Sequence, residues 1–405
     1  MPATPKETND DRPGFGIVSN VATPYRIHLQ RRVVAEIPQL KLYSFFTHGR
    51  ADFNWEVRDA EAINPIWLGD ERYYEYEAGR PRNWVREYRK AGRIIDTVRR
   101  RRIAAVLVNG YRDLTRVRLI RWCRAHGIHV FMRGDSNIRG DRPRTVLHAW
   151  AKRRLLAWVI RSCDAVMPMG RLGQAYFEKY GADPGRCFWV PYEPDYDIFT
   201  TADPDAIAAF RAEHGLAASR RYLLFGGRLV PVKRVDLLID AFVRIADRRG
   251  DWNLIIAGDG RLREELAARV PRSLADRVIW LGFLEVDAMR LAYHVADVMV
   301  LPSDYEPWAL VVNEAMAAGC PVVSSDVVGA AWDMVKDRVS GRLFPAGDID
   351  ALTEALLDVT DAATGARYRE ATDEALADWR RRADPVEGIR QALQSVGVLP
   401  DSVTS

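Results

Sequence analysis

The sequence has few cysteines, and their arrangement excludes most metal and redox sites. Cys123, Cys163, Cys187 and Cys320 are scattered over 405 residues and form no C-x-x-C pair. Scattered cysteines are most simply reduced thiols of a cytosolic protein. The four cysteines and seven histidines also lack metal-ligand spacing. We therefore expect a cytoplasmic protein with no bound metal.

Long apolar runs are missing as well. No run reaches the roughly 18 residues that a membrane-spanning helix needs. The polar start MPATPKETNDDRPG contains no apolar segment of the kind found in signal peptides. We expect residues 1–13 and the last few residues to be disordered, and we expect neither a spanning nor a secreted protein.

Charge is present but unevenly distributed. Residues 1–195 contain 35 Lys and Arg against 22 Asp and Glu, and the remainder contains 24 against 33. Such an imbalance predicts different partners for the two halves. A basic half suits an anionic surface or an anionic acceptor, and we expect no nucleic-acid partner. A chain of this length is sufficient for two domains.

The most informative stretch is residues 303–330, SDYEPWALVVNEAMAAGCPVVSSDVVGA. The apolar run just before it, 298–301, predicts a buried parallel strand. Pro307 can start a helix over Trp308–Ala318, which Gly319 and Pro321 then end. The loop at the carboxyl end of a parallel strand is where open α/β sheets bind ligands.

Two carboxylates, Glu306 and Glu314, lie eight residues apart in this stretch. That spacing corresponds to roughly 12 Å along a helix axis, so one ligand of nucleotide-sugar size could touch both. The N–H groups of residues 308–311 would attract a diphosphate between them. Taken alone, the two residues could equally be a first-turn acid and a solvated helix residue.

A second stretch, residues 226–242, reads GGRLVPVKRVDLLIDAF. Its glycines permit a close backbone approach, and the cations Arg228 and Lys233 precede a predicted helix. In isolation it could also be a solvated basic loop.

Both stretches resemble the retaining GT-B glycosyltransferases of family 4, the glycosyl transferases group 1. That family has an acid, seven residues, a Glu, a run of small residues and G-x-P-V-V. Its other motif is G-R-L-x-x-x-K-G-x-x-x-L-I-x-A-F, and here Arg234 replaces the glycine after the lysine. The resemblance is strongest over residues 222–350, moderate over 164–200 and weak before 164.

The resemblance implies an α/β fold of the GT-B type, with two Rossmann-like doubly wound domains facing across a deep cleft. We expect an acceptor-binding domain over residues 1–195 and a donor-binding domain over 196–377. Residues 378–405 would form a helix that crosses back to the first domain, and then a mobile tail. The segment Phe188–Phe199 resembles the family's crossover, which puts the domain boundary near Asp195.

The resemblance also implies a retaining hexosyltransferase of cell-surface glycan or glycolipid biosynthesis. It would move a sugar from a nucleotide-diphosphate sugar to a hydroxyl acceptor without a cofactor. Arg228, Lys233 and Glu306 would be catalytic: the two cations hold the diphosphate and Glu306 the sugar hydroxyls. The donor-binding set is Gly227, Arg228, Lys233, Gly258, Phe283, Leu284, Glu306, Trp308, Ala309, Leu310, Val311 and Glu314. Within it, Glu314 would hold the ribose, and Phe283 with Leu284 the base.

The acceptor side departs from the family. The first loop, NVATPYR, lacks the paired glycines common there, which leaves Asn20, Tyr25 or Arg26 to face the acceptor. The loop after the strand 128–132 lacks the family's histidine, so Arg133 and Asp135 are candidates there, or they cap the loop. Residues 47–82, with Trp55, Trp67, Tyr73, Tyr74 and Tyr76, form an acceptor flap or a packed surface loop.

Several alternatives stay open. The chain could be a nucleotide-sugar epimerase of related fold, a nucleotide-sugar sensor, or a glycosyltransferase for a soluble small acceptor. A dehydrogenase is disfavoured because no G-x-G-x-x-G follows the first strand. The sequence leaves open the sugar, the base, the linkage and the oligomeric state.

A further expectation concerns the basic helices predicted at 83–102 and 142–161, which carry Trp84, Trp150 and Trp158. Cations with interfacial aromatics predict docking on an anionic membrane surface at its cytoplasmic face, where a lipid-linked acceptor would lie. The alternatives are that the apolar stripe of the second helix packs on the sheet, or that the arginines serve a soluble anionic acceptor.

Overall fold

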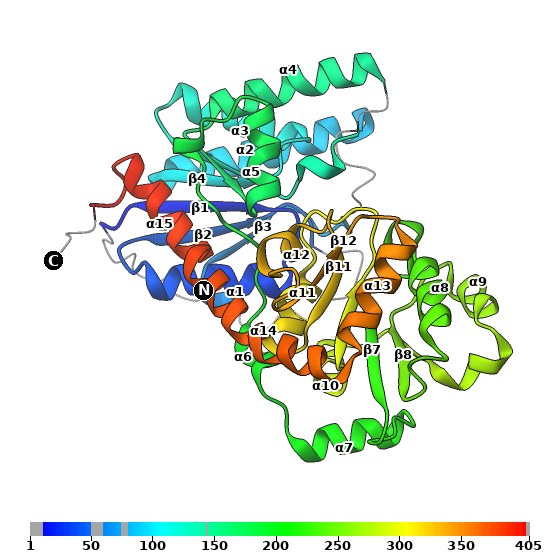
Figure 1. Ribbon diagram of the computed structural model, residues 1–405. Coiled ribbons are helices and arrows are strands. Elements are labelled where there is room, and N and C mark those ends of the chain that lie inside the picture. Colours follow the sequence, from blue (N-terminus) through cyan, green and yellow to red (C-terminus); the bar gives the residue numbers. More distant parts are fainter. Residues whose placement is uncertain (1–10, 50–59, 74–79, 143–144, 402–405) are drawn as a thin grey trace.

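The computed structural model describes residues 11–49, 60–73, 80–142 and 145–401, which form two parallel β-sheets flanked by helices (Figure 1). The predicted α/β fold with two doubly wound, Rossmann-like halves is confirmed. The predicted disorder at residues 1–10 and 402–405 falls outside the described residues. So do Trp55, Tyr74 and Tyr76 of the proposed flap.

The first sheet has six parallel strands in the order β3-β2-β1-β4-β5-β6. The strands are β1 (Gly14–Ser19), β2 (Lys41–Phe46), β3 (Pro65–Trp67), β4 (Ile103–Asn109), β5 (His129–Gly134) and β6 (Ala165–Pro168). The central strand β1, GFGIVS, is buried along its whole length. Burial on both faces is the usual reason that parallel strands read as continuous apolar runs.

Helices cover both faces of this sheet. One core unites it with α2 (Trp84–Arg100), α3 (Leu114–Ala125), α4 (Val146–Ser162) and α5 (Arg171–Lys179). The opposite face packs on α1 (Pro24–Glu36). Asp113 and Thr145 cap α3 and α4, since their side chains accept hydrogen bonds from the N–H groups of Arg116 and His148.

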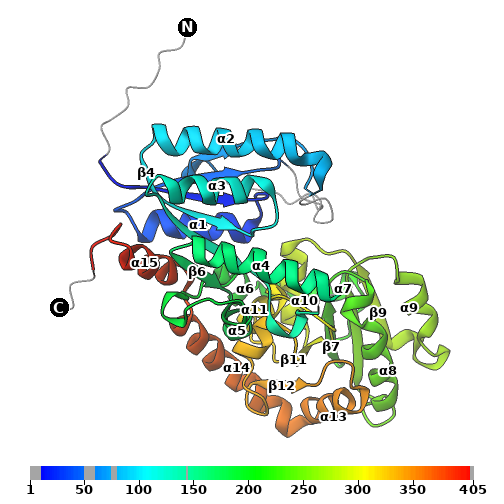
Figure 2. The same ribbon diagram turned by 90° about the horizontal axis from the view of Figure 1, so that it is seen from above.

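The second sheet repeats the arrangement in the order β12-β11-β10-β7-β8-β9. Its strands are β7 (Arg221–Gly226), β8 (Trp252–Ala257), β9 (Val278–Gly282), β10 (Val298–Leu301), β11 (Val322–Ser325) and β12 (Gly341–Phe344). Its helices are α7 (Pro204–Glu213), α8 (Val235–Ile245), α9 (Arg263–Arg269), α10 (Val286–Val295), α11 (Leu310–Ala317), α12 (Gly329–Met334) and α13 (Ile349–Val359). Figure 2 shows this half beside the first, with α2 and α3 on the outer side of the first half.

Each sheet has one point where the strand order reverses, between β1 and β4 in the first and between β7 and β10 in the second. Ligands of open α/β sheets bind outside the carboxyl ends of the strands at this point. The loops after β7 and β10 contain Arg228 and Glu306. The second sheet therefore positions both predicted donor motifs at its reversal point.

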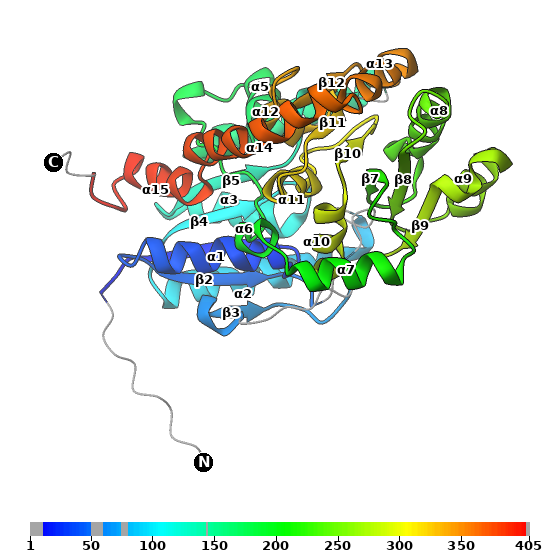
Figure 3. The same cartoon turned by 60° about the horizontal axis from the view of Figure 1, so that its bottom comes forward.

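The chain passes between the two cores around Asp195. Val190 packs with the first core, whereas Tyr196 and Phe199 of α6 (Tyr196–Thr200) pack with the second. The chain returns through α14 (Ala362–Arg382) and α15 (Pro385–Ser395), which follow one another in Figure 3. α15 packs under the first sheet. The return occurs after Arg382, because α14 continues through the predicted junction at 377/378.

Most predicted strands and helices agree with the structure to within a few residues, but three differences matter. β3 and β12 were not predicted, because they have only three and four residues. The helix expected to start at Pro307 begins only at Leu310, so this prediction was wrong.

Candidate active site

The loops after β7, β8 and β9 pack tightly against one another on the donor side. The N–H of Gly227 donates to the Ala257 carbonyl at 2.9 Å, and the N–H of Gly258 donates to the Gly282 carbonyl at 2.6 Å. Gly258 has φ +150°, and a Cβ there would lie 1.8 Å from the Gly227 oxygen. Gly258 was predicted to contact the donor. Its lack of a side chain is needed in any case for the close approach of the Gly227 and Gly258 backbones.

Two cations project from the loop after β7. Arg228 is exposed, and Lys233 ends the short 3₁₀ helix η6 (Pro231–Lys233). The Lys233 ammonium forms an ion pair with the Glu306 carboxylate, and the two side chains are only 15% and 12% exposed. The structure thus brings together two of the three predicted catalytic residues across the sheet's reversal point.

Arg234 explains the one departure from the predicted motif. Its backbone is left-handed, with φ +50° and ψ +42°, at the start of α8. A glycine adopts this conformation at the least cost, which accounts for the glycine in the family pattern. Here the guanidinium lies 3.1 Å from both Asp236 and Asp304, and these ion pairs offset the strain.

Glu306 lies in an extended segment, and the helix predicted to begin directly after it starts only at Leu310. The segment pairs with Val328, and the N–H of Gly329 donates to the Glu306 carbonyl at 3.3 Å. Ala309 follows with φ +82°, and this left-handed residue delays α11 until Leu310. The Ser303 hydroxyl donates to Glu306 Oε1 at 3.2 Å, which fixes the carboxylate.

Trp308 was predicted to bind the donor through its backbone N–H. Its side chain is buried, with its ring 5.5 Å from that of Trp379 on α14, and its carbonyl accepts from the Ala330 N–H at 2.9 Å. The Trp308 side chain therefore belongs to the core, and only the backbone N–H stays a candidate for the donor. Leu310 and Val311 open α11, where their N–H groups belong to the first turn.

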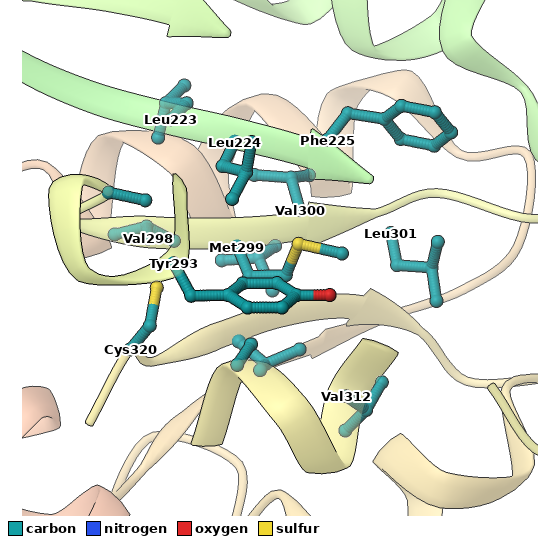
Figure 4. Close-up of a cluster of buried hydrophobic side chains, with 14 of the residues drawn as sticks. Leu223, Leu224, Phe225, Tyr293, Val298, Met299, Val300, Leu301, Val312 and Cys320 are labelled. Atoms are coloured by element: carbon teal, nitrogen blue, oxygen red, sulfur yellow. The ribbon is translucent and has the colours of Figure 1, made fainter. Parts of the chain in front are cut away.

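Glu314 is paired with a residue that the sequence reading missed. The phenol of Tyr293, on α10, donates to Glu314 Oε2 at 2.8 Å. Figure 4 shows the Tyr293 ring among apolar side chains of β10 and α11. Burial raises the pKa of Glu314 to about 7, although the Tyr293 hydrogen bond acts in the opposite direction. Glu314 is therefore not the solvated helix residue of the alternative interpretation.

Phe283 and Leu284 follow β9, beside the glycine loops. Phe283 is 54% exposed, and Leu284 packs partly on the second core. Their placement leaves the Phe283 ring accessible at the edge where a base was predicted. That role remains a proposal.

The acceptor-side candidates separate into two groups. Tyr25, Arg26 and Arg133 gather around Tyr192 of the crossover segment, with the Tyr25 and Tyr192 rings 4.8 Å apart. Asp135, next to Arg133, is exposed. Asn20 instead accepts a hydrogen bond from Arg116, a buried residue of α3. Tyr192 was missed although it lies in the crossover segment that marked the domain boundary.

Of the two roles left open for Arg133, an acceptor contact or a loop cap, the structure favours a structural one. It is 3% exposed, and its Nε and Nη2 donate to the Val190 and Pro191 carbonyls at 2.8 and 2.7 Å. Its guanidinium also stacks on the Tyr192 ring, 4.5 Å from the centroid. Arg133 therefore fixes the crossover segment, and Asp135 remains the candidate of this loop.

The loop containing Asp135 reaches the donor motif. Asn137 is 1% exposed, and its amide donates to the Glu306 carbonyl at 2.8 Å and to the Val327 carbonyl at 3.1 Å. Arg139 forms an ion pair with Asp326, and a Cβ on Gly140 would overlap the Tyr305 ring. The residues 137–140 thus couple the first domain to the segment that carries Glu306. Asn137 was in the predicted loop but was not singled out.

In the described part of the chain, no group of three or more His, Cys, Asp or Glu is placed to hold a metal ion. Among the described helices, none combines the length and apolar character that bilayer spanning requires.

The segment that carries these donor-motif residues matches a known protein family. Residues 206–376 match the family model of glycosyl transferases group 1. This match covers the loops that carry Arg228, Lys233, Glu306 and Glu314, and it does not favour the epimerase alternative.

Relatives with curated names share only part of their length with this chain. An uncharacterized glycosyltransferase of Methanocaldococcus jannaschii is 39% identical over 135 residues, which are 33% of this chain and 34% of that protein. A D-inositol 3-phosphate glycosyltransferase of Geodermatophilus obscurus is 38% identical over 42% of this chain and 39% of its own length. The chain therefore spans a third to two fifths of these two relatives.

Solved structures match over almost the whole chain. HepE of Anabaena, in complex with UDP and glucose, has a TM-score of 0.71 at 17% identity and is covered completely by 95% of this chain. Sucrose-phosphate synthase of Thermosynechococcus elongatus has a TM-score of 0.74 at 18% identity, with 95% and 100% coverage. At such low identity the likeness shows the fold, which is that of GT-B glycosyltransferases.

Proposed function

We propose that the chain is a retaining glycosyltransferase that moves a hexose from a nucleotide-diphosphate sugar to a hydroxyl acceptor. The observation that carries this proposal is the contact between Lys233 and Glu306 at the reversal point of the second sheet. Arg228 lies in the same connection as Lys233, between β7 and β8. Glu314 lies in the same connection as Glu306, between β10 and β11. The group 1 match over residues 206–376 supports it.

The transfer needs stabilisation of the departing diphosphate. The bond from sugar C1 to the phosphate oxygen breaks, and its electron pair stays on that oxygen. Arg228 can hold the resulting charge with two parallel hydrogen bonds, and Lys233 adds a point charge. The first-turn N–H groups of α11 contribute fixed dipoles.

The acceptor completes the exchange. Its hydroxyl oxygen forms the new bond to C1, and its proton passes to the departing phosphate oxygen. Attack and departure on the same face retain the anomeric configuration, so no side-chain nucleophile is required. Glu306 has the role of binding sugar hydroxyls, which distinguishes it from the nucleophile of a retaining glycosidase.

The remaining donor contacts follow from the placement of each residue. Glu314, held by Tyr293, would accept hydrogen bonds from the ribose hydroxyls. Phe283 and Leu284 would border the base. Asp135, Tyr25 and Arg26 would lie on the acceptor side.

The names of the relatives suggest the classes of donor and acceptor. HepE was solved with UDP and glucose, and a Corynebacterium glutamicum relative, 30% identical over half of this chain, is a GDP-mannose-dependent mannosyltransferase of a phosphatidylinositol mannoside. We therefore propose a UDP- or GDP-hexose donor and a polyol or lipid-linked acceptor of cell-surface glycan synthesis in the cytoplasm. A soluble small-molecule acceptor is the alternative.

Slow donor hydrolysis tests the proposal without knowledge of the acceptor. We expect release of nucleoside diphosphate from one UDP- or GDP-hexose, and proton NMR should show that the freed sugar first has the donor's anomeric configuration. Release with inversion would overturn the retaining assignment. Release that persists in a Lys233→Ala/Glu306→Ala variant would overturn the site.

A further inference from the structure

The N-terminal ends of α2 and α4 expose large apolar side chains. On α2 these are Trp84, Val85 and Tyr88, which are between 53% and 66% exposed. On α4 they are Val146, Leu147 and Trp150, between 59% and 88% exposed. Single exposed apolar residues are normal, but two clusters at two helix ends indicate an interaction surface.

The topology places both clusters on the edge of the first domain that faces its ligand. The C-terminal ends of α2, α3 and α4 lead within a few residues into the amino ends of β4, β5 and β6. Each helix therefore runs antiparallel to the strands, and its N-terminus lies near their carboxyl edge. Asn20 and the 135–140 loop follow strands at that same edge. In Figure 1, α2, α3 and α4 lie together on one side of the sheet.

The three helices are strongly cationic. α2 has six basic and two acidic residues, and α3 and α4 have four basic residues each and no acidic ones. Several acids near this surface are paired with cations, whereas Asp135 is exposed. Glu87 is buried against Thr115 and Lys90, and Asp141 lies 2.6 and 2.7 Å from Lys152 and Lys179. The exposed arginines, among them Arg153 and Arg154, leave this face positive.

A hollow runs along α3 from Leu114 to His126, and Tyr88 of α2 borders it. It has a volume of about 390 Å³, and Tyr88, Val117 and Trp122 line it together with Arg118 and Arg121. The Arg118 guanidinium stacks 3.5 Å from the Tyr88 ring centroid. Apolar walls beside guanidinium groups suit a molecule that has both hydrocarbon and phosphate.

We propose that the exposed N-terminal halves of α2, α3 and α4, here termed the docking rim, bind the surface of an anionic phospholipid membrane. The apolar side chains would enter the interface, and the arginines would face lipid phosphates. A second copy of the chain is a poorer occupant, because a two-fold contact would oppose cations to cations. The proposal does not rest on glycosyl transfer. If both hold, a lipid-linked acceptor would lie at the sheet edge where transfer occurs.

The structure also identifies the residues to test. Lys152 of α4 pairs with Asp141 and lies over the Tyr176 ring, so its substitution would disturb the fold. Arg153 and Arg154 are exposed on α4 and suit charge reversal. Leu147→Ser/Trp150→Ser removes the apolar contribution separately.

Vesicle flotation with the full chain tests the proposal. We expect binding to phosphatidylcholine vesicles only when phosphatidylglycerol is included, and we expect added salt to weaken it. Each basic residue near an anionic surface contributes roughly fivefold in affinity, so Arg153→Glu/Arg154→Glu should weaken binding by more than about tenfold. Leu147→Ser/Trp150→Ser should also reduce binding.

A matched control is Arg248→Glu/Arg272→Glu, which makes the same charge change on exposed sites of the second domain. This variant should float like the wild type, and all variants should keep the wild-type melting temperature. Equal binding to neutral and anionic vesicles would overturn the proposal. So would equal loss in the control, or a concentration-dependent dimer that the rim substitutions dissolve.

Discussion

The Lys233 ammonium, at the end of the loop after β7, contacts the Glu306 carboxylate in the segment after β10. Ser303 donates a hydrogen bond to the same carboxylate, and Asn137 of the first domain holds the Glu306 main chain. The two charges were predicted to serve different parts of one ligand. Their contact means that a change in one alters the electrostatics of the other.

Removal of either predicted phosphate cation should slow donor cleavage. We expect Arg228→Ala and Lys233→Ala each to lower the rate by on the order of 10²–10³, because each removes charge stabilisation of the departing diphosphate. Steady-state release of nucleoside diphosphate measures this. Lys336→Ala, which removes a partly exposed Lys–Asp pair in the same domain, is the control. Near-normal turnover in both cation variants would contradict the assignment.

The two carboxylates should separate binding from transfer. We expect Glu314→Ala to weaken binding of a free nucleoside diphosphate, because the ribose contact is lost. We expect Glu306→Ala to preserve or tighten that binding, since Lys233 loses its competing carboxylate, and yet to abolish transfer. Isothermal titration of both variants is the measurement. Equal affinity in the two variants, with normal transfer, would show that the motif was misread.

The raised pKa of Glu314 should make stability fall with pH. Between the ordinary pKa of Glu, about 4.5, and about 7, the folded protein keeps a proton that the unfolded chain has lost. Unfolding free energy therefore decreases as pH rises through this window. We expect Glu314→Gln to remove the decrease and to be more stable at pH 8 by up to about 3 kcal/mol. Chemical denaturation at pH 5 and pH 8 checks this, and parallel curves for both proteins would refute it.

Asn137 should act as a positioning residue for Glu306. Asn137→Ala removes two hydrogen bonds to buried carbonyls, so we expect roughly 1–3 kcal/mol of destabilisation and a fall in kcat with little change in KM for the donor. The control is Asn253→Ala, which removes a buried amide that accepts from Arg220 at 2.9 Å on β8. If Asn137 had only a structural role, Asn137→Ala and Asn253→Ala would be equally stable. They would also be equally active at a temperature at which both are folded.

The strands of the fold could be predicted from local patterns, whereas the donor role of the two motifs came from their resemblance to a known family and stays a prediction. The buried runs of β1 and β10 are examples of the first, and the spacing of Glu306 and Glu314 is an example of the second. Arg234 was flagged as a departure, and its left-handed backbone gives that departure a physical reason. Such signals are contained within a few neighbouring residues.

The remaining details depend on contacts between distant segments. The helix did not begin at Pro307 because Gly329 and Ala330 bind the Glu306 and Trp308 carbonyls, and Ala309 is left-handed. The role of Arg133 stayed open in the sequence because its partners, Val190 and Pro191, lie almost sixty residues on. Packing of the α4 stripe on the sheet was one of the alternatives, and the structure divides the stripe: Val159 is buried, whereas Leu147 and Trp150 are exposed.

Thermal unfolding in the presence of UDP, GDP, ADP and their hexose derivatives tests the central claim most directly. A ligand at 100 times its Kd stabilises the folded state by about 2.7 kcal/mol. We expect at least one nucleotide series to raise the melting temperature of the wild type and of Lys336→Ala, and to have little effect on Arg228→Ala/Lys233→Ala. No shift with any nucleotide, or an equal shift in the double variant, would contradict a donor site at these residues.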